Sequence, residues 1–352
     1  MAERFARGGR LVAFGRSPTA RSDARHVAVE FVHPVIVGKR ALPAIGLAGE
    51  GGDLARQVEL LARADDIAIA FGAEQEAARA VGVARAVGCL TIAFSALGAE
   101  WEFEPPTDDP YIRQELVETL YHVLWELVHV FFEHRGRLSG RTERRGHDAG
   151  ASSFLYPFLA EREDNLDDVL EDVRGSVLMK ADEVAALRAQ TLTDNAGELA
   201  AAADAVRGGL DAGGALLALG NGGSATDAMD VVADFRAAGR RAIDLTEDAA
   251  ILTAIANDIG TDAIFSRQVI AYGSAGDALL AISTSGGSSN VIEALGEARR
   301  RGLVTVALVG YDGGRIASEG LADHVIVTRS QHIPRIQEAQ ASAYHVLQEL
   351  VG

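Results

Sequence analysis

The chain has 352 residues, which is enough for two domains of ordinary size, each with its own hydrophobic core. Hydrophobic residues make up 48% of the chain, and no stretch of about 18 consecutive apolar residues occurs. We therefore expect a cytoplasmic protein with no membrane partner. The net charge of −17 argues against nucleic-acid binding, and the single cysteine excludes an internal disulfide and a cysteine-based zinc cluster.

The N-terminal part alternates short apolar runs with helical patterns. The first strand-like run, LVAF, leads through GRSPTA into a helix that carries His26 and Glu30. A strand–helix–strand pattern follows at 65–95, and Cys89 lies in its second apolar run, where we expect a buried, inert thiol. A last helix then carries Gln114 and His122. This alternation is typical of βαβ units and a parallel sheet.

The middle of the chain is rich in Gly, Ser and Arg and is interpreted as a linker. We therefore expect an N-terminal domain at 1–134, a linker at 135–160 and a C-terminal domain at 161–352. The first part of the C-terminal domain, 163–214, has an amphipathic pattern that predicts two or three helices with no counterpart in the N-terminal domain.

The C-terminal domain repeats the plan of the N-terminal one. Matching segments occur in the same order, such as ARQV and SRQV, and ELVETLYHVLWELV and EAQASAYHVLQELV. The apolar runs predict five strands, at 215–219, 241–245, 278–283, 303–309 and 324–328. The sequence therefore predicts an α/β protein with two flavodoxin-like three-layer sandwiches in tandem, each with a parallel sheet.

Two loops of the C-terminal domain stand where ligands bind in such sheets. The loop GNGGS at 220–224 lacks the third glycine of a dinucleotide fingerprint, because position 225 is Ala. The loop STSGGSSN at 283–290 places four hydroxyls at the start of a helix, which favours a phosphate ester without any lysine. A serine-rich helix cap in a tight turn is the structural alternative.

These loops, together with AIANDIGTDAIFSRQV, ALVGYDGG and PRIQEAQASAYHVLQEL, resemble the sugar isomerase (SIS) fold and, within it, the phosphoheptose isomerases. The resemblance covers about 165–352, and 10–130 more weakly. It implies that a sugar phosphate is held by ten residues and by Gln337 on the last helix; the ten are Asn221, Gly222, Gly223, Ser224, Asn257, Asp258, Ser283, Thr284, Ser285 and Ser288.

The resemblance also implies a His and a Glu on the first helix and a Gln and a His on the last, commonly around zinc. In the C-terminal domain Gln337 and His345 match, but the first pair is Asp230 and Asp234. In the N-terminal domain all four match, so zinc would be held by His26, Glu30, Gln114 and His122. Its phosphate loops are lost, and Glu74 and Glu76 are expected to repel phosphate.

The proton-transfer residues are therefore divided between the copies, and the catalytic candidates are Glu30, His122, Asp234 and His345. We expect a phosphoheptose isomerase that interconverts sedoheptulose 7-phosphate and D-glycero-D-manno-heptose 7-phosphate through an enediol, with a composite site as one hypothesis. The alternative is a non-catalytic SIS module that binds a sugar phosphate or a protein partner as a regulator. In that case the two histidines of the N-terminal copy would be structural remnants. A transferase is disfavoured because no nucleophilic cysteine is present.

Association is expected as well. The segment YHVLWELVHVFF at 121–132 is very apolar for a fully exposed helix; burial beneath the chain's own linker helices is the alternative explanation. A homodimer of two-domain chains would resemble a tetramer of single SIS units.

Overall fold

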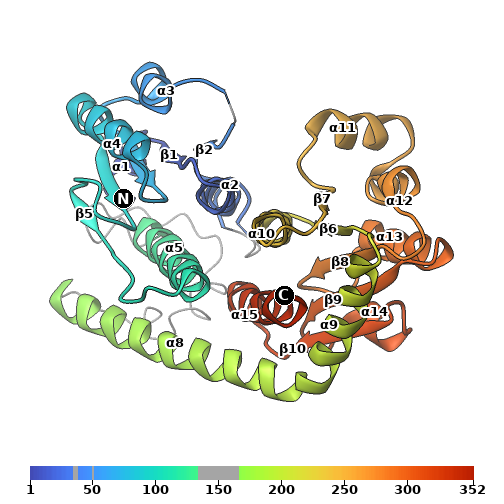
Figure 1. Ribbon diagram of the computed structural model, residues 1–352. Helices are drawn as coiled ribbons and strands as arrows, with labels where there is room; N and C mark the ends of the chain where they lie inside the picture. Colours follow the sequence, from blue (N-terminus) through green and yellow to red (C-terminus); the bar gives the residue numbers. More distant parts are fainter. Residues whose placement is uncertain (35–38, 50, 134–165) are drawn as a thin grey trace. The chain divides into compact units, whose positions relative to one another are not determined.

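The computed structural model describes residues 1–34, 39–49, 51–133 and 166–352 (Figure 1). These residues form two compact units, Met1–Glu183 and Val184–Gly352, and each unit contains one five-stranded parallel sheet. The expected linker, 135–160, lies outside the described residues. In the part of the chain that is described, every helix is too short or too polar to cross a membrane.

The sheet of the first unit has the strand order β2-β1-β3-β4-β5. In chain order the strands are β1 (Leu11–Phe14), β2 (Ala44–Leu47), β3 (Ile67–Ala70), β4 (Leu90–Ala93) and β5 (Trp101–Glu102). All four pairings are parallel, and Leu11 lies opposite both Ala44 and Ile67. The residues of β1 and β3 are buried on both faces, as expected for strands covered by helices on both sides.

Helices cover both faces of this sheet. One core joins it to α1 (Ala2–Ala6), α2 (Pro18–Val32) and α5 (Pro110–Glu133). The other core joins it to α3 (Leu54–Leu61) and α4 (Gln75–Val87) and includes Cys89, which is 6% exposed. Burial raises the pKa of the Cys89 thiol to about 11, so this cysteine is the inert, buried residue that its sequence context predicted.

The apolar segment at 121–132 is largely explained by burial within its own unit. Tyr121 and Trp125 of α5 are at most 1% exposed and pack in the core with α1 and α2. The hydrophobicity of this helix is therefore not evidence for association. The structure supports burial for these residues, and the core that buries them is formed with α1 and α2 rather than with the linker helices that the sequence suggested.

The second unit begins within the long helix α8 (Leu166–Asp194), which α9 (Ala196–Asp211) follows. These two helices correspond to the amphipathic region expected before the C-terminal sheet. That sheet has the order β10-β9-β8-β6-β7, so both sheets follow the same flavodoxin-like order that the sequence predicted. Its strands, in chain order, are β6 (Leu216–Gly220), β7 (Ala242–Asp244), β8 (Ala278–Ser283), β9 (Val304–Gly310) and β10 (His324–Thr328).

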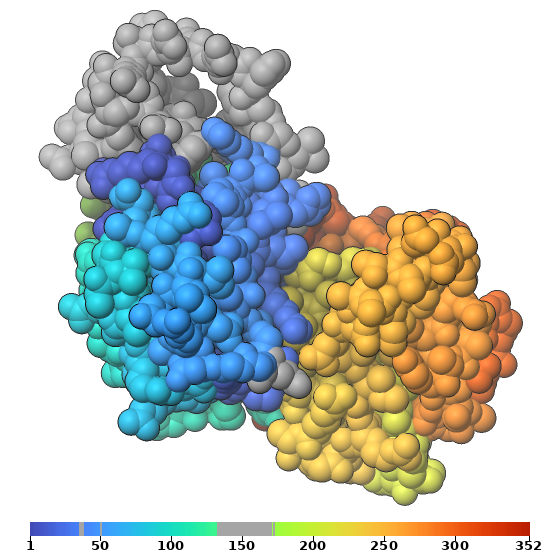
Figure 2. Space-filling model, turned by 90° about the horizontal axis from the view of Figure 1, so that it is seen from above, coloured from blue at the N-terminus to red at the C-terminus, as the bar shows by residue number. Residues whose placement is uncertain are grey.

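Two helical layers enclose this sheet as well, as Figure 1 shows. On one face lie α9, α10 (Gly223–Ala237) and α15 (Ile333–Val351). On the other lie α12 (Ser266–Tyr272), α13 (Ser289–Arg300) and α14 (Gly314–Ser318). The helix α11 (Ala249–Asp258) has no buried residue, and its atoms form part of the surface of this unit in Figure 2; a short 3-10 turn, η2 (Thr261–Ala263), follows it.

Candidate functional site

The site of the second unit lies where β6 and β8 end. These strands are neighbours, and Gly220 at the end of β6 lies opposite Ile282, one residue before the end of β8. The helix after β6, α10, packs on one face of the sheet, whereas the helix after β8, α13, packs on the other. The crevice between two such connections is the usual ligand site of an open parallel sheet. The two loops singled out in the sequence are therefore brought together at this point.

The loop after β6 is held in a tight turn that requires glycine. A Cβ atom at Gly220 would lie 2.2 Å from the carbonyl oxygen of Ser224, so a side chain there has no space. Gly222 has φ 59°, in the left-handed region that favours glycine, and directly precedes α10. Gly223 and Ser224 form the buried start of that helix. The glycines thus bring the backbone N–H groups of a helix N-terminus to the edge of the sheet.

The loops are joined by a pair of asparagines. The side-chain amide of Asn221 donates to Asn290 Oδ1 at 3.0 Å, and that of Asn290 donates to Asn221 Oδ1 at 2.9 Å. Asn290 Oδ1 also accepts the backbone N–H of Val291 at 2.9 Å. The sequence-based assignment included Asn221 but missed Asn290, whose only local signal was its place in the serine-rich loop. These two hydrogen bonds connect the loop after β6 directly to the loop after β8.

The hydroxyl groups of the serine-rich loop make few hydrogen bonds within the described part of the chain. Ser288 is the residue before α13, yet its side chain makes no capping hydrogen bond. Ser285 is exposed, and its hydroxyl accepts only the N–H of Gly287, at 3.2 Å, among the described residues. Ser283 is buried at the strand end and Thr284 is half-buried beside it. Because a simple helix cap would use Ser288, its uncommitted hydroxyl favours the phosphate-binding interpretation over the structural one.

Asn257 and Asp258 lie at the surface of this unit, on α11. Both are exposed at the C-terminal end of α11, and the side-chain amide of Asn257 donates to Asp258 Oδ1 at 2.7 Å. That bond is the only one their side chains make to described residues. Their assignment to substrate binding stays a prediction.

A half-buried carboxyl and a buried histidine face each other between α10 and α15. The Oδ2 atom of Asp234 lies 3.9 Å from Nε2 of His345, and the side chains are 13% and 3% exposed. Burial raises the pKa of Asp234 to about 6, although His345 acts in the opposite direction. The expected companions, Asp230 on α10 and Gln337 on α15, are also buried. This unit therefore contains a carboxyl poised to exchange a proton near neutral pH, with an imidazole beside it.

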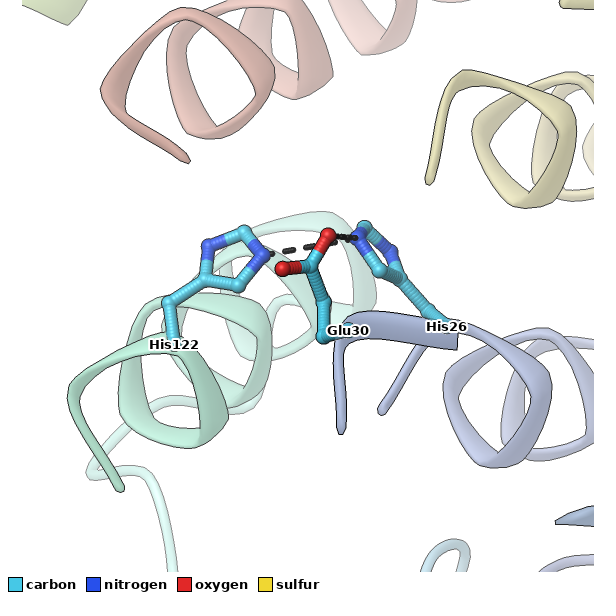
Figure 3. A group of neighbouring side chains, drawn as sticks. All are labelled: His26, Glu30 and His122. Atoms are coloured by element: carbon cyan, nitrogen blue, oxygen red, sulfur yellow. Dashed lines mark hydrogen bonds and ion pairs between the residues drawn. The ribbon is translucent and has the colours of Figure 1, made fainter. Parts of the chain in front are cut away.

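The first unit contains a second group of titratable side chains, shown in Figure 3. His26 and Glu30 of α2 and His122 of α5 are at most 2% exposed. Nε2 of His26 lies 3.4 Å from Nε2 of His122 and 3.9 Å from Oε1 of Glu30, while Nδ1 of His26 lies 2.9 Å from the hydroxyl oxygen of Tyr121. Burial, aided by His122, lowers the pKa of His26 well below its usual value, so its imidazole is neutral.

This group fits a metal ion in its donors and spacing. One ligand atom from each of His26, Glu30 and His122 lies within 4.8 Å of the others, and Glu30 Oε2 is buried without a hydrogen-bond partner. Tetrahedral zinc, with bonds of about 2 Å, needs ligand atoms about 3.3 Å apart. Gln114, the expected fourth ligand, is half-buried two turns before His122 on α5. Glu118 of the same helix was missed, although its carboxylate lies within 4.8 Å of a ring nitrogen of His26.

The sheet edge of the first unit is filled by its own carboxylates. Glu74 Oε1 accepts the backbone N–H of Ser17 at 3.0 Å, and Glu76 Oε1 accepts that of Leu54 at 2.9 Å. Both N–H groups lie at the start of a helix, α2 or α3, where an anion would bind. Arg16 pairs with Glu76 at 2.7 Å and lowers the pKa of that carboxyl to about 2, helped by the Leu54 N–H. Glu74 and Glu76 thus already accept hydrogen bonds from the N–H groups that a phosphate would need. This effect adds to the electrostatic repulsion that the sequence predicted.

The chain is similar in sequence to proteins of one family. A family model described as the SIS domain matches residues 181–310. A phosphoheptose isomerase of Geobacter sp. (strain M21) is 42% identical over 189 residues, which cover 52% of this chain and 95% of that protein. A phosphoheptose isomerase of Citrifermentans bemidjiense is 49% identical over 146 residues, covering 40% of this chain and 75% of that protein.

The fold comparison extends to both units. The C-terminal domain of a glucosamine-fructose-6-phosphate aminotransferase from Francisella tularensis matches with a TM-score of 0.62 over 99% of this chain and 86% of that one. At 9% sequence identity this match concerns the fold alone. The two relatives described above share far more of the sequence and are matched over most of their length. The chain therefore belongs to the phosphoheptose isomerase family of SIS-domain proteins.

Proposed function

We propose that the chain is an aldose–ketose isomerase of phosphorylated sugars, with sedoheptulose 7-phosphate as its substrate and D-glycero-D-manno-heptose 7-phosphate as its product. The observation that carries the proposal is the half-buried Asp234 beside His345, in the same unit as an uncommitted serine loop. The relatives that share this unit are named phosphoheptose isomerases. A non-catalytic module that only binds a sugar phosphate would need the serine loop, but it would not need a titratable carboxyl facing a histidine.

The geometry assigns a role to each part of the unit. The hydroxyls of the serine loop and the N–H groups at the start of α13 would hold the phosphate dianion. Asp234, in its carboxylate form, would remove the proton from the carbon next to the carbonyl, and the protonated acid would return it to the adjacent carbon. His345 would donate to, and then accept from, the sugar oxygens as the enediol forms and collapses. No atom is gained or lost in this exchange.

Asp230 and Asp234 are the point at which this unit departs from the pattern implied by the family resemblance. An aspartate is one methylene shorter than a glutamate, and a displacement of about 1 Å can reduce the rate about 100-fold. We therefore expect slower turnover than in a chain with glutamate at position 234. Protein partners or regulation need not be invoked to explain a reduced rate.

For the first unit we propose a zinc site formed by His26, Glu30 and His122, with Gln114 as a candidate fourth ligand. The neutral imidazole of His26 and the unpartnered Oε2 of Glu30 support it. Zinc would supply a Lewis acid or a structural crosslink. Metal analysis of protein purified without chelator, for the wild type and His26→Ala, tests the site: a loss of bound zinc in the variant is expected, and metal-free wild-type protein contradicts it.

The activity is tested with the full chain and sedoheptulose 7-phosphate. Turnover by the wild type, with at least 100-fold loss in Asp234→Asn, supports catalysis by this unit. Glu30→Ala tests the sequence-based assignment of Glu30 and His122 to proton transfer: a comparable loss supports it, and full activity refutes it. Thermal stabilisation by the sugar phosphate without any turnover would show the non-catalytic alternative to be correct. We also expect a homodimer, to be checked by analytical ultracentrifugation.

A further inference from the structure

A cavity adjoins the serine loop on the side of β9 and β10. It has a volume of about 630 Å³ and lies at the carboxyl ends of β8, β9 and β10. All of its lining residues have polar side chains: Ser285, Tyr311, Asp312, Arg329, Ser330 and Gln331. Of the hydroxyl residues in the serine loop, Ser285 alone lines it. The cavity therefore adjoins the serine loop, and each residue that lines it carries a polar group.

Backbone contacts join the serine loop to the loop after β9, which lines the same cavity. The backbone N–H of Gly310 donates to the Thr284 carbonyl at 3.1 Å, and that of Ile316 donates to the Gly286 carbonyl at 2.9 Å. A Cβ atom at Gly286 would lie 2.2 Å from the carbonyl oxygen of Gly313, so the two loops approach too closely for any side chain. The position of Ser285 relative to the β9 loop is thus determined by backbone contacts.

Tyr311 is held in the loop after β9 in a strained conformation. Its φ of 54° lies in the left-handed region, and every other residue with positive φ in the described part of the chain is a glycine. Such a conformation costs free energy in a residue with a bulky side chain, and it persists where the surroundings impose it, often at a ligand site. Here it places an aromatic side chain on the cavity, where a glycine would have been unstrained.

Arg329 supplies a positive charge at the same cavity. It is exposed directly after β10 and makes no hydrogen bond or ion pair to any described residue, including Asp312 across the cavity. Asp312 instead accepts the N–H of Gly314 at 3.1 Å. A guanidinium that pairs with no protein carboxylate remains available for an anion, and it forms strong, charge-assisted bonds with phosphate oxygens.

We propose that Arg329 is a substrate-binding residue that pairs with the phosphate of the sugar phosphate at the Ser285 side of the serine loop. Tyr311 and Asp312 face the polyol part of the same ligand: the ring covers its C–H groups and the carboxylate accepts its hydroxyls. The ligand class is a phosphate monoester of a polyhydroxylated chain. This inference deepens the proposed function, on which it rests, by naming a binding residue that the loop motifs do not contain.

The test measures binding separately from turnover. Inorganic phosphate is titrated calorimetrically into the full chain, and KM and kcat are measured with sedoheptulose 7-phosphate. Arg329→Ala is expected to weaken phosphate binding and raise KM about 10- to 100-fold, with kcat within about 3-fold of the wild type. Arg329→Lys is expected to regain part of the affinity, because it restores the charge but not the planar fork.

The matched control is Arg267→Ala, which removes another exposed arginine from the same unit, on α12 and outside the cavity. It is expected to leave phosphate affinity and KM unchanged. The proposal is overturned if Arg329→Ala binds phosphate within 2-fold of the wild type, or if Arg267→Ala weakens binding equally. Failure of the proposed function looks different, because phosphate binding would still depend on Arg329 while no isomerisation occurred.

Tyr311→Gly provides a second variant that separates binding from folding. Glycine accepts the φ of this position without strain, so the melting temperature is expected to be unchanged or raised. KM is nevertheless expected to rise, because the ring that faces the sugar is lost. A lower melting temperature with unchanged KM would show that Tyr311 serves packing, and would overturn its assignment to the ligand.

Discussion

Asp234 and His345 come from two helices far apart in sequence, α10 and α15, yet Oδ2 of Asp234 lies 3.9 Å from Nε2 of His345. This separation is longer than a hydrogen bond, so the pair has room for a longer acidic side chain. We expect Asp234→Glu to raise kcat about 10-fold, because the added methylene extends the carboxylate toward the reacting carbon. Steady-state kinetics with sedoheptulose 7-phosphate measures the change.

The control for this variant is Asp234→Asn, which keeps the shape but cannot act as a base. It is expected to lose a factor of about 10² to 10⁴ in kcat while phosphate binding stays unchanged. If Asp234→Asn retained full turnover, Asp234 would have no part in proton transfer. A drop in phosphate affinity in both variants would instead indicate a distorted loop.

The pH dependence of activity follows from the raised pKa of Asp234. Burial shifts it from 3.8 to about 6, so the basic carboxylate is populated only above that pH. We expect kcat/KM to rise with pH through about 6 and to level off above it. The profile is measured between pH 4.5 and 8.5, and a flat acidic limb would contradict this assignment.

The same shift affects stability with a definite sign. Because the folded-state pKa is above the unfolded value, the contribution of Asp234 is fully favourable below pH 3.8 and is lost as pH rises through about 6. Replacing Asp234 by Asn should therefore stabilise the protein by about 2–3 kcal/mol at pH 8 and by almost nothing at pH 4. Denaturant unfolding at the two pH values checks this difference.

Ser288→Ala separates the two interpretations of the serine loop. Since the Ser288 side chain makes no capping bond, the substitution should change the free energy of unfolding by less than about 0.5 kcal/mol. Phosphate affinity should nevertheless fall, because one hydroxyl donor is lost. Calorimetry and denaturant unfolding measure the two quantities.

Asp248→Ala is the matched control for that variant. Asp248 caps α11 by accepting the N–H groups of Ala250 and Ile251, so its loss should cost about 1 kcal/mol. An equal loss of stability in Ser288→Ala would show that Ser288 is an ordinary cap, contrary to the phosphate-binding interpretation.

The reciprocal bonds between Asn221 and Asn290 predict coupling between two loops that lie 69 residues apart in sequence. Asn290→Ala should destabilise the protein by about 1 kcal/mol and weaken phosphate binding, because the loops lose their direct connection. A double-mutant cycle with Asn221→Ala provides the control. If the two losses of stability were simply additive, the pair would not couple the loops.

The negatively charged carboxylate of Glu76 in the first unit should stabilise the folded protein. Its folded-state pKa is lowered from 4.5 to about 2 by Arg16, so its contribution is present above pH 4.5 and is lost as pH falls through 2. Glu76→Gln should lower the melting temperature at pH 7, and the difference from the wild type should shrink toward pH 3. Glu59→Gln, which removes an exposed partner of Arg56, should have little effect.

The sequence alone determined the architecture and drew attention to the loops, because both depend on local patterns along the chain. Apolar runs located β8 and β10 correctly, and the other C-terminal strands within two residues, since strands buried on both faces must be apolar throughout. The residues of the serine loop were identifiable because hydroxyls and glycines at a strand end have few other uses.

The tertiary structure decided the features that depend on contacts between distant residues. No local pattern indicates that Asn290 meets Asn221, that Arg329 shares a cavity with Ser285, or that Glu76 accepts the N–H of Leu54. The raised pKa of Asp234 has the same origin, because it reflects burial between α10 and α15 rather than the identity of the residue. Burial and hydrogen bonding arise only when the chain is folded, so these properties follow from the packed structure.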